Sequence, residues 1–142
     1  MSFQWLQMRI SEEKDRRQRE AVIQQRLPLA LEELHQAMLD CVAGYTKAFG
    51  EPAADLHVYS GKIRVTVREE QNGKWEQRAK VEISVQPKLP GLRVEYGGEP
   101  MEIEVGMLPD EKTFYKDGDK YLTMEELTRR ILDRVFFPKL SE

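Results

Sequence analysis

The sequence predicts one α+β domain, and three changes in hydrophobic periodicity carry that prediction. Apolar residues recur every three or four positions between residues 27 and 49, which is the spacing of a helix. From residue 56 to 105 apolar and polar residues alternate as in half-buried strands, and a helical spacing returns after residue 123. Strands with one apolar face each are typical of helices packed on one side of an antiparallel sheet; a β-sandwich is the alternative.

We therefore expect two N-terminal helical segments, a four- to five-stranded antiparallel meander, and a C-terminal helix packed on one face of the sheet. Residues 1–26 form an N-terminal apolar cluster and charged helical arm, and residues 27–142 form the single α+β domain. A length of 142 residues suits one domain with a sizeable core. No segment repeats, and none resembles a family motif.

Composition excludes several classes of protein. Hydrophobic residues make up 40% and charged residues 33% of the chain, which is ordinary for a folded, soluble protein. The single cysteine, Cys41, excludes an intramolecular disulfide, and there is neither a secretory signal nor an apolar run of about 20 residues that could span a bilayer. We expect a cytoplasmic protein without a membrane partner. The net charge of −3 argues against broad binding to nucleic acid.

Residues 1–26 begin with an apolar cluster that lies outside the main core pattern. The run from 11 to 20 that follows has almost no apolar side chain, but acids precede bases by four residues, as in Glu13 and Arg17, which stabilises a solvated helix. The cluster either folds back onto its own domain or docks on a second copy or another protein. Its members are Phe3, Trp5, Leu6, Met8 and Ile10.

A proline separates the two predicted helical segments. Pro28 lacks an N–H and its ring would clash with the carbonyl of Gln24, so the first helix should break or kink there and the second should begin. The second helix should end near Phe49, because Gly50 and Pro52 follow it. Its apolar stripe comprises Leu27, Leu31, Leu34, Met38, Val42, Tyr45 and Phe49.

The first hairpin turns at an Asn-Gly pair, residues 72 and 73. Core residues can face one another across this turn only if the loop has three residues, 72–74, with a left-handed glycine. That register pairs Val65 with Val81. We therefore predict the three-residue loop.

Two further turns predict two further hairpins. A two-residue loop at the glycines 97–98 would place Arg93 opposite Glu102, which is typical of a solvated sheet face. Residues 117–118 form the turn of a short third hairpin. A capping box at residues 123–126 should begin the last helix, which should end before Pro138.

The titratable residues do not form a catalytic or metal-binding pattern. His35 lies at the edge of the helical stripe, His57 follows Asp55 by two residues without a nucleophile beside it, and Cys41 faces the core. The acidic run that begins at Asp117 does not match a calcium loop, since its glycine is misplaced. We predict neither a cofactor nor a metal and no catalytic residue.

These observations favour a non-enzymatic protein-interaction module that self-associates through the N-terminal arm, most simply as a homodimer. The displaced apolar cluster and the lack of a catalytic pattern support this hypothesis. The interaction candidates are Phe3, Trp5, Leu6, Met8 and Ile10.

Two alternatives belong to other classes of protein. The first is a small-molecule-binding protein or enzyme with a pocket between the sheet and the helices. Its candidate pocket residues are Tyr45, His57, Tyr59 and Tyr96. The second is a weak nucleic-acid binder through the first hairpin, where basic side chains surround a tryptophan that can stack on a base. Its candidate residues are Arg64, Arg68, Trp75, Arg78 and Lys80.

Overall fold

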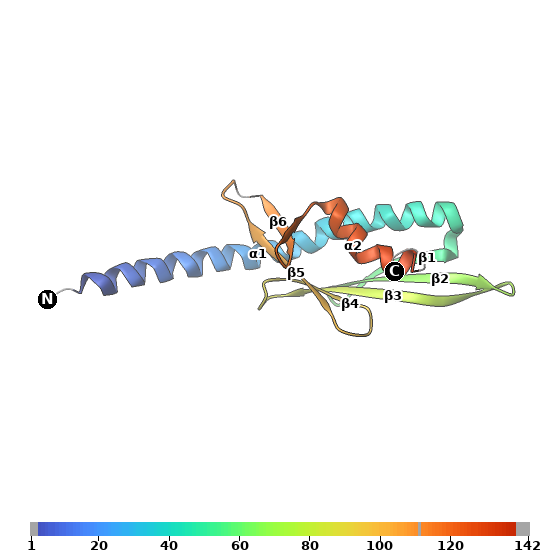
Figure 1. The fold of residues 1–142 in the computed structure, drawn as a ribbon, viewed down its shortest axis with the longest axis horizontal. Helices are drawn as coiled ribbons and strands as arrows, with labels where there is room; N and C mark the ends of the chain where they lie inside the picture. Colours follow the sequence, from blue (N-terminus) through green and yellow to red (C-terminus); the bar gives the residue numbers. More distant parts are fainter. Residues whose placement is uncertain (1–2, 111, 139–142) are drawn as a thin grey trace.

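The fold consists of a long helix, a seven-stranded antiparallel sheet and a shorter final helix (Figure 1). The computed structural model describes residues 3–110 and 112–138, so residues 1–2 of the predicted arm and residues 111 and 139–142 of the predicted domain lie outside the described part. The helices are α1 (Gln4–Phe49), the short 3-10 helix η1 (Glu51–Ala53) and α2 (Met124–Phe136). The strands are β1 (Ala54–Tyr59), β2 (Lys62–Gln71), β3 (Lys74–Gln86), β4 (Gly91–Glu95), β5 (Met101–Met107), β6 (Thr113–Asp117) and β7 (Lys120–Leu122).

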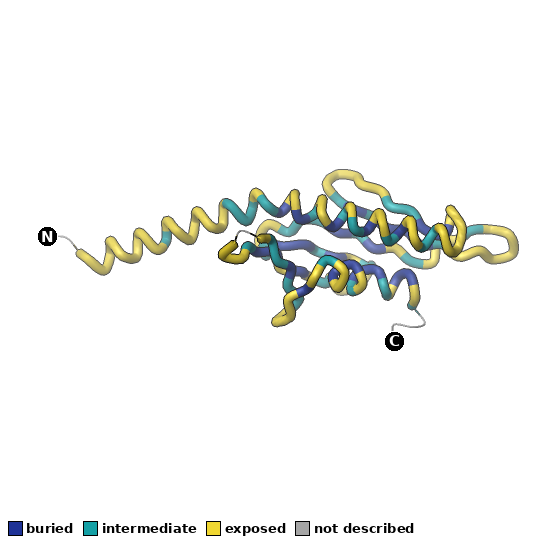
Figure 2. Tube along the Cα trace, turned by 90° about the horizontal axis from the view of Figure 1, so that it is seen from above, coloured by how far each residue is buried: buried dark blue, intermediate teal, exposed yellow. Residues whose placement is uncertain are grey.

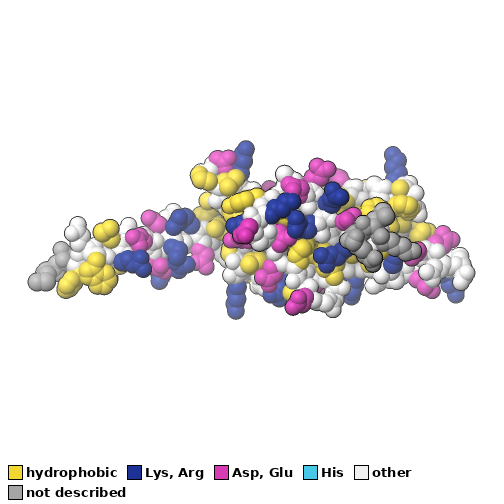
Figure 3. Space-filling model, in the orientation of Figure 1, with side chains coloured by type: hydrophobic (Ala, Val, Ile, Leu, Met, Phe, Trp, Pro, Cys, Tyr) yellow, Lys and Arg dark blue, Asp and Glu magenta, His cyan; other side chains and the backbone are white. Residues whose placement is uncertain are grey.

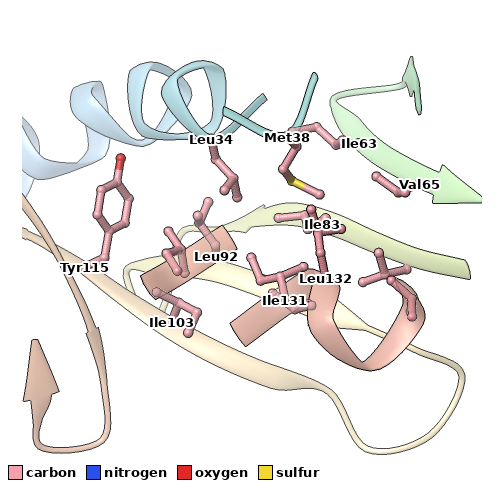
Figure 4. Close-up of a cluster of buried hydrophobic side chains, with 14 of the residues drawn as sticks. Leu34, Met38, Ile63, Val65, Ile83, Leu92, Ile103, Tyr115, Ile131 and Leu132 are labelled. Carbon is pink, nitrogen blue, oxygen red and sulfur yellow. The ribbon is translucent and has the colours of Figure 1, made fainter. Parts of the chain in front are cut away.

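The strands follow one another across the sheet in chain order, each antiparallel to the next. Alternate strand residues face both helices and form one core with them, as Figure 4 shows. Figure 2 marks this core in dark blue on the sheet, on the second half of α1 and on α2. Fully burying a Leu or Ile side chain contributes about 1.5–3 kcal/mol, so this cluster is the main source of stability. Among its fully buried members are Leu34, Met38, Ile83, Leu92, Ile103 and Ile131.

The α+β class is confirmed, but the sheet has seven strands instead of the four or five expected. β6 and β7, which were predicted as a short third hairpin, continue the sheet beside β5. The prediction also overlooked β1, an edge strand whose buried face is short. Within β1 only Ala54 at its start is buried, whereas Val58 near its end is 56% exposed. A strand with so few buried side chains gives a weak alternation in the sequence.

α1 does not break at Pro28, so the prediction of two helical segments is wrong. Pro28 lies on the exposed side of α1, whereas Leu27 and Ala30 beside it are each 1% exposed. Their burial against the sheet offsets the roughly 3 kcal/mol that a proline costs inside a helix. The side-chain amide of Gln24 also donates to the carbonyl of Pro87 at 2.7 Å, which ties α1 to the loop after β3. One continuous helix therefore connects the arm to the core.

The hairpin of β2 and β3 has the predicted register but a different turn. Val65 faces Val81 as expected, yet the loop contains only residues 72–73, both with positive φ angles, as a two-residue hairpin turn of this kind requires. A β-bulge in β3 supplies the residue that a longer loop would have provided. The register shifts after Val67, which leaves Arg78 without a partner in β2. The predicted three-residue loop is therefore wrong.

The register of the second hairpin, the third hairpin and the helix cap agree with the sequence, although residues 96–100, and not the two glycines alone, separate β4 from β5. Arg93 of β4 faces Glu102 of β5, and their side chains form an ion pair at 3.2 Å. β6 and β7 form the third hairpin. The Thr123 hydroxyl accepts from the backbone N–H of Glu126, and the Glu126 carboxylate accepts from the N–H of Thr123, which is the complete capping box.

Candidate interaction surface

The first residues of α1 carry an exposed apolar cluster, which we call the tip and which Figure 3 shows in yellow at the end of the molecule marked N in Figure 1. Its side chains are between 39% and 64% exposed, and none belongs to the core or to the partly buried side chains packed against it among the described residues. The tip consists of Phe3 (55%), Trp5 (64%), Leu6 (39%), Met8 (60%) and Ile10 (40%).

The helical spacing distributes the tip side chains around α1. Leu6 and Ile10 are four residues apart and so lie on one side of the helix, and Phe3 precedes the helix as its N-cap residue. Trp5 and Met8 are three residues apart and lie on a second side. A helix segment that is apolar on more than one side is normally buried by its surroundings, and this segment is not.

The tip stands away from the domain on a charged segment of α1, residues 11–20, which we call the shaft. Figures 1 and 2 show the tip and the shaft extending beyond the sheet, and every shaft residue except Glu13 is exposed. The structure thus does not fold the cluster back onto its own domain. Of the two placements that the sequence left open, only docking on another molecule would cover these side chains.

Ion pairs along the shaft support its helical conformation. Glu13 binds Arg16 at 2.8 Å and Arg17 at 3.0 Å, and Arg16 also binds Glu20 at 2.8 Å. The hydrogen bonds from Arg16 and Arg17 lower the pKa of Glu13 to about 2. Such exposed pairs contribute modestly, but a helix already anchored in the core needs no separate nucleation to extend outward. The shaft therefore presents the tip on a defined helical support.

A shallow apolar groove with a volume of about 400 Å³ lies between the last third of α1 and α2; we call it the α1–α2 groove. Its α1 wall includes Cys41, Gly44 and Ala48, and its α2 wall includes Leu132. Burial is the largest influence on the Cys41 thiol and raises its pKa, so the thiol is mostly protonated at neutral pH. The groove offers an apolar surface with few polar contacts.

An aromatic cluster closes one end of the α1–α2 groove. Tyr45 stacks on Phe136 with 4.4 Å between ring centroids, and Phe49 and Phe137 contact Tyr45 at 4.8 and 5.9 Å. Phe49 is 56% exposed, although the predicted helical stripe placed it with the core. The sequence did not predict this groove, because its two walls lie some 80 residues apart in the chain. The adjacent phenylalanines at the end of α2 were the feature of the sequence that could have indicated an aromatic surface there.

The four pocket candidates do not share a pocket. His57 and Tyr59 lie on β1 and face away from the helices, where the Tyr59 ring lies 4.7 Å below the guanidinium of Arg64. Tyr45 and Tyr96 lie on the helix side, but at separate places. The Tyr96 hydroxyl donates to the carbonyl of Ile131 at 2.7 Å, and burial raises its pKa to about 12.

The basic residues of the first hairpin mostly bind groups of their own chain. Arg64 donates to Glu82 at 3.0 Å, Arg68 forms an ion pair with Asp55, and Arg78 donates to the carbonyls of Val135 and Phe136 at 2.7 and 2.9 Å. The indole of Trp75 lies beside Gly50. Lys80 forms no ion pair within the described ranges. These residues do not form one basic strip.

Possible metal ligands are dispersed. Within residues 3–110 and 112–138 no three His, Cys, Asp or Glu side chains gather closely enough to hold a metal ion. The imidazole of His57 lies 3.4 Å from Asp55, and that of His35 lies 3.5 Å from Glu32. No helix in the described part of the chain combines the length and the apolar character needed to cross a bilayer.

Comparisons with protein-family models, with curated proteins and with solved structures returned no significant match.

Proposed function

We propose that this chain is a non-enzymatic interaction module that self-associates through its N-terminal arm. A single observation carries the proposal: five large apolar side chains are exposed together on a helical arm that extends away from the domain. Scattered apolar residues are normal on protein surfaces, but a contiguous exposed group usually marks an interface. Trp, Phe and Met are also among the side chains that are enriched in interface cores.

The free energy available from the tip is large enough for association. Fully burying each tip side chain would contribute about 1.5–3 kcal/mol, and roughly half of this remains to be gained because the side chains are already partly shielded. Two tips in a symmetric dimer would double the contribution. Association costs an estimated 4–15 kcal/mol, so a weak to moderate dimer is the expected result.

Sedimentation over a range of concentrations tests this proposal on the full chain. We expect the parent chain to self-associate, and the double variant Trp5→Ala/Met8→Ala to associate at least tenfold more weakly. The matched control is Val58→Ala/Tyr121→Ala, because Val58 and Tyr121 are 56% and 58% exposed but lie on strands outside the tip. Equal association by the parent and the tip variant would contradict the proposal.

The alternative of a small-molecule binder has one supporting observation. The α1–α2 groove, and not the filled space between sheet and helices, has the apolar walls and a volume of about 400 Å³ that suit a small ligand. A thermal-shift screen against common metabolites and nucleotides tests this. A reproducible rise in Tm that is lost in Gly44→Glu would support a ligand in the groove, whereas no rise across the panel would leave self-association as the function.

A further inference from the structure

We propose that the tip of one copy docks in the α1–α2 groove of a second copy. This inference rests on the proposed self-association and names the surface that receives the tip. Three properties of the described residues favour a second copy as the occupant of the groove: the length of α1, the complementarity of the two surfaces, and the symmetry of the pairing.

The length of α1 excludes docking within one chain. An α-helix rises 1.5 Å per residue, so Ile10 at the end of the tip lies about 45 Å from Cys41 at the start of the groove. α1 is continuous between these residues, including at Pro28, and cannot bend the tip back onto its own groove. Only the groove of another molecule is within reach of the tip.

The two surfaces match in shape and polarity. The tip is a short helical segment with apolar side chains on two sides, and the groove is an apolar trough between two helices. An amphipathic helix laid into such a trough is a recurring mode of recognition. Phe49 and Phe137, which are 56% and 39% exposed at the aromatic end of the groove, would be covered by the incoming side chains.

Charge also favours this pairing. The groove is lined by Glu125, Asp133 and Arg129, which sum to one negative charge. The tip contains one charged residue, Arg9, and the first turn of α1 has no acidic side chain to offset the positive end of the helix dipole. The positive end of one helix would thus enter a groove of net negative charge.

The positions of tip and groove along α1 allow both contacts to form at once. If two α1 helices lie antiparallel about a twofold axis near Arg26, residues 3–10 of each lie beside residues 42–49 of the other. That range contains most of the α1 residues that line the groove, namely Gly44, Tyr45, Ala48 and Phe49. A symmetric pair uses each tip and each groove once and closes without further growth.

Cross-linking through the native cysteine tests the docking directly. Cys41 is the single cysteine of the chain and lies in the groove. A Met8→Cys/Cys41→Ser chain is mixed with the parent chain under mild oxidation, and intact mass identifies the products. We expect a disulfide-linked pair with one chain of each kind. The control is Val58→Cys/Cys41→Ser, since Val58 is 56% exposed on β1; a Met8→Cys yield no higher than this control would overturn the assignment.

A groove substitution gives a second, independent measurement. The added side chain in Gly44→Glu meets open space, with no atom within 4 Å of its Cβ, so the fold should be retained. We expect its dimer dissociation constant to rise at least tenfold. Ala43→Glu adds the same charge to an exposed neighbour outside the groove and should change the constant less than twofold.

These experiments distinguish failure of the groove assignment from failure of the proposed self-association. If Trp5→Ala/Met8→Ala weakens self-association but Gly44→Glu does not, the chain self-associates through the tip and the groove assignment is wrong. If the parent chain stays monomeric at all concentrations, both proposals fail. Tip-dependent sedimentation of such a monomer with phosphatidylcholine vesicles would then assign the tip to a lipid surface.

Discussion

Arg78 shows how one residue outside the strand pairing can stabilise a distant helix. The β-bulge frees it from β2, and its guanidinium donates to the carbonyls of Val135 and Phe136 in the last turn of α2. Carbonyls at the end of a helix lack partners within the helix, and a cation there also interacts favourably with the helix dipole. The sequence does not reveal the bulge, so Arg78 appears there as one of the nucleic-acid candidates of the first hairpin.

Replacing Arg78 tests this role. We expect Arg78→Met to lower the free energy of unfolding by about 1–2 kcal/mol, since it removes two charge-assisted hydrogen bonds at a partly solvated site. Urea unfolding measures the change. Lys80→Met, two residues along β3 and without an ion pair in the described ranges, should stay within about 0.5 kcal/mol. Equal effects of the two substitutions would show that Arg78 does not stabilise α2.

Gly106 is a second residue whose role depends on its neighbour. A Cβ at this position would lie 2.2 and 2.5 Å from two ring atoms of Phe114, its cross-strand partner in β6. The aromatic ring therefore covers the glycine, an arrangement that protects a strand glycine from water.

We predict that Gly106→Ala displaces the Phe114 ring and lowers the free energy of unfolding by about 1–3 kcal/mol. Thermal and urea unfolding measure the loss. Gly98→Ala is the matched control, because no atom lies within 4 Å of its added Cβ and its φ angle is not in the left-handed region. It should be neutral or slightly stabilising. An equally neutral Gly106→Ala would show that the ring moves aside without cost.

At the scale of elements, α1 joins an apolar tip, a charged shaft and a buried half in one helix. The buried half is already helical because it packs against the sheet, so extending the helix through the arm needs no separate nucleation. The sequence predicted the tip, the shaft and the buried stripe separately, since each has its own pattern. The continuity of α1 could not be predicted from the sequence, because the local chemistry of Pro28 favours a break. The helix continues because the residues on both sides of Pro28, Leu27 and Ala30, are packed against the sheet.

Pro28→Ala should therefore stabilise the chain. The substitution restores a backbone N–H and relieves the clash with the preceding turn, which is worth about 3 kcal/mol, but loses about 1 kcal/mol of restriction in the unfolded chain. We expect a net gain of about 2 kcal/mol in urea unfolding. Gln25→Ala, an exposed position one turn earlier, should gain only a few tenths. A loss of stability in Pro28→Ala would mean that α1 requires the proline at this position to pack.

The shaft should lose helical structure in acid. The pKa of Glu13 is lowered to about 2 in the folded arm, so its support is fully present above the ordinary value of 4.5 and is lost as the pH falls from there through about 2. Carbon chemical shifts of residues 11–20 report the local helix content. We expect the change to fall between about pH 4.5 and 2 and to be much smaller in Glu13→Gln. An identical titration in both chains would exclude the ion pairs as its cause.

At the scale of the whole molecule, the alternation of apolar residues was sufficient to predict the class of fold and most of the sheet. Strand faces were predicted correctly because one face of each strand is buried, as at Val65, Ile83 and Ile103. The sequence showed that the apolar tip lies outside the core pattern. It did not show how far the tip lies from the domain, because that distance depends on the continuity of α1. The groove was not predictable, because it exists only where α2 packs beside the end of α1.

The order of the sheet has a consequence for synthesis on the ribosome. α1 emerges before every strand that covers its buried stripe, and those strands follow one by one in chain order as far as β5. At about 5–20 residues per second, the stretch from the end of α1 to the end of β5 takes roughly 3–12 s to appear. During that interval the nascent chain displays Leu27, Leu34 and Met38 to its surroundings, so α1 is the segment for which protection by chaperones matters most.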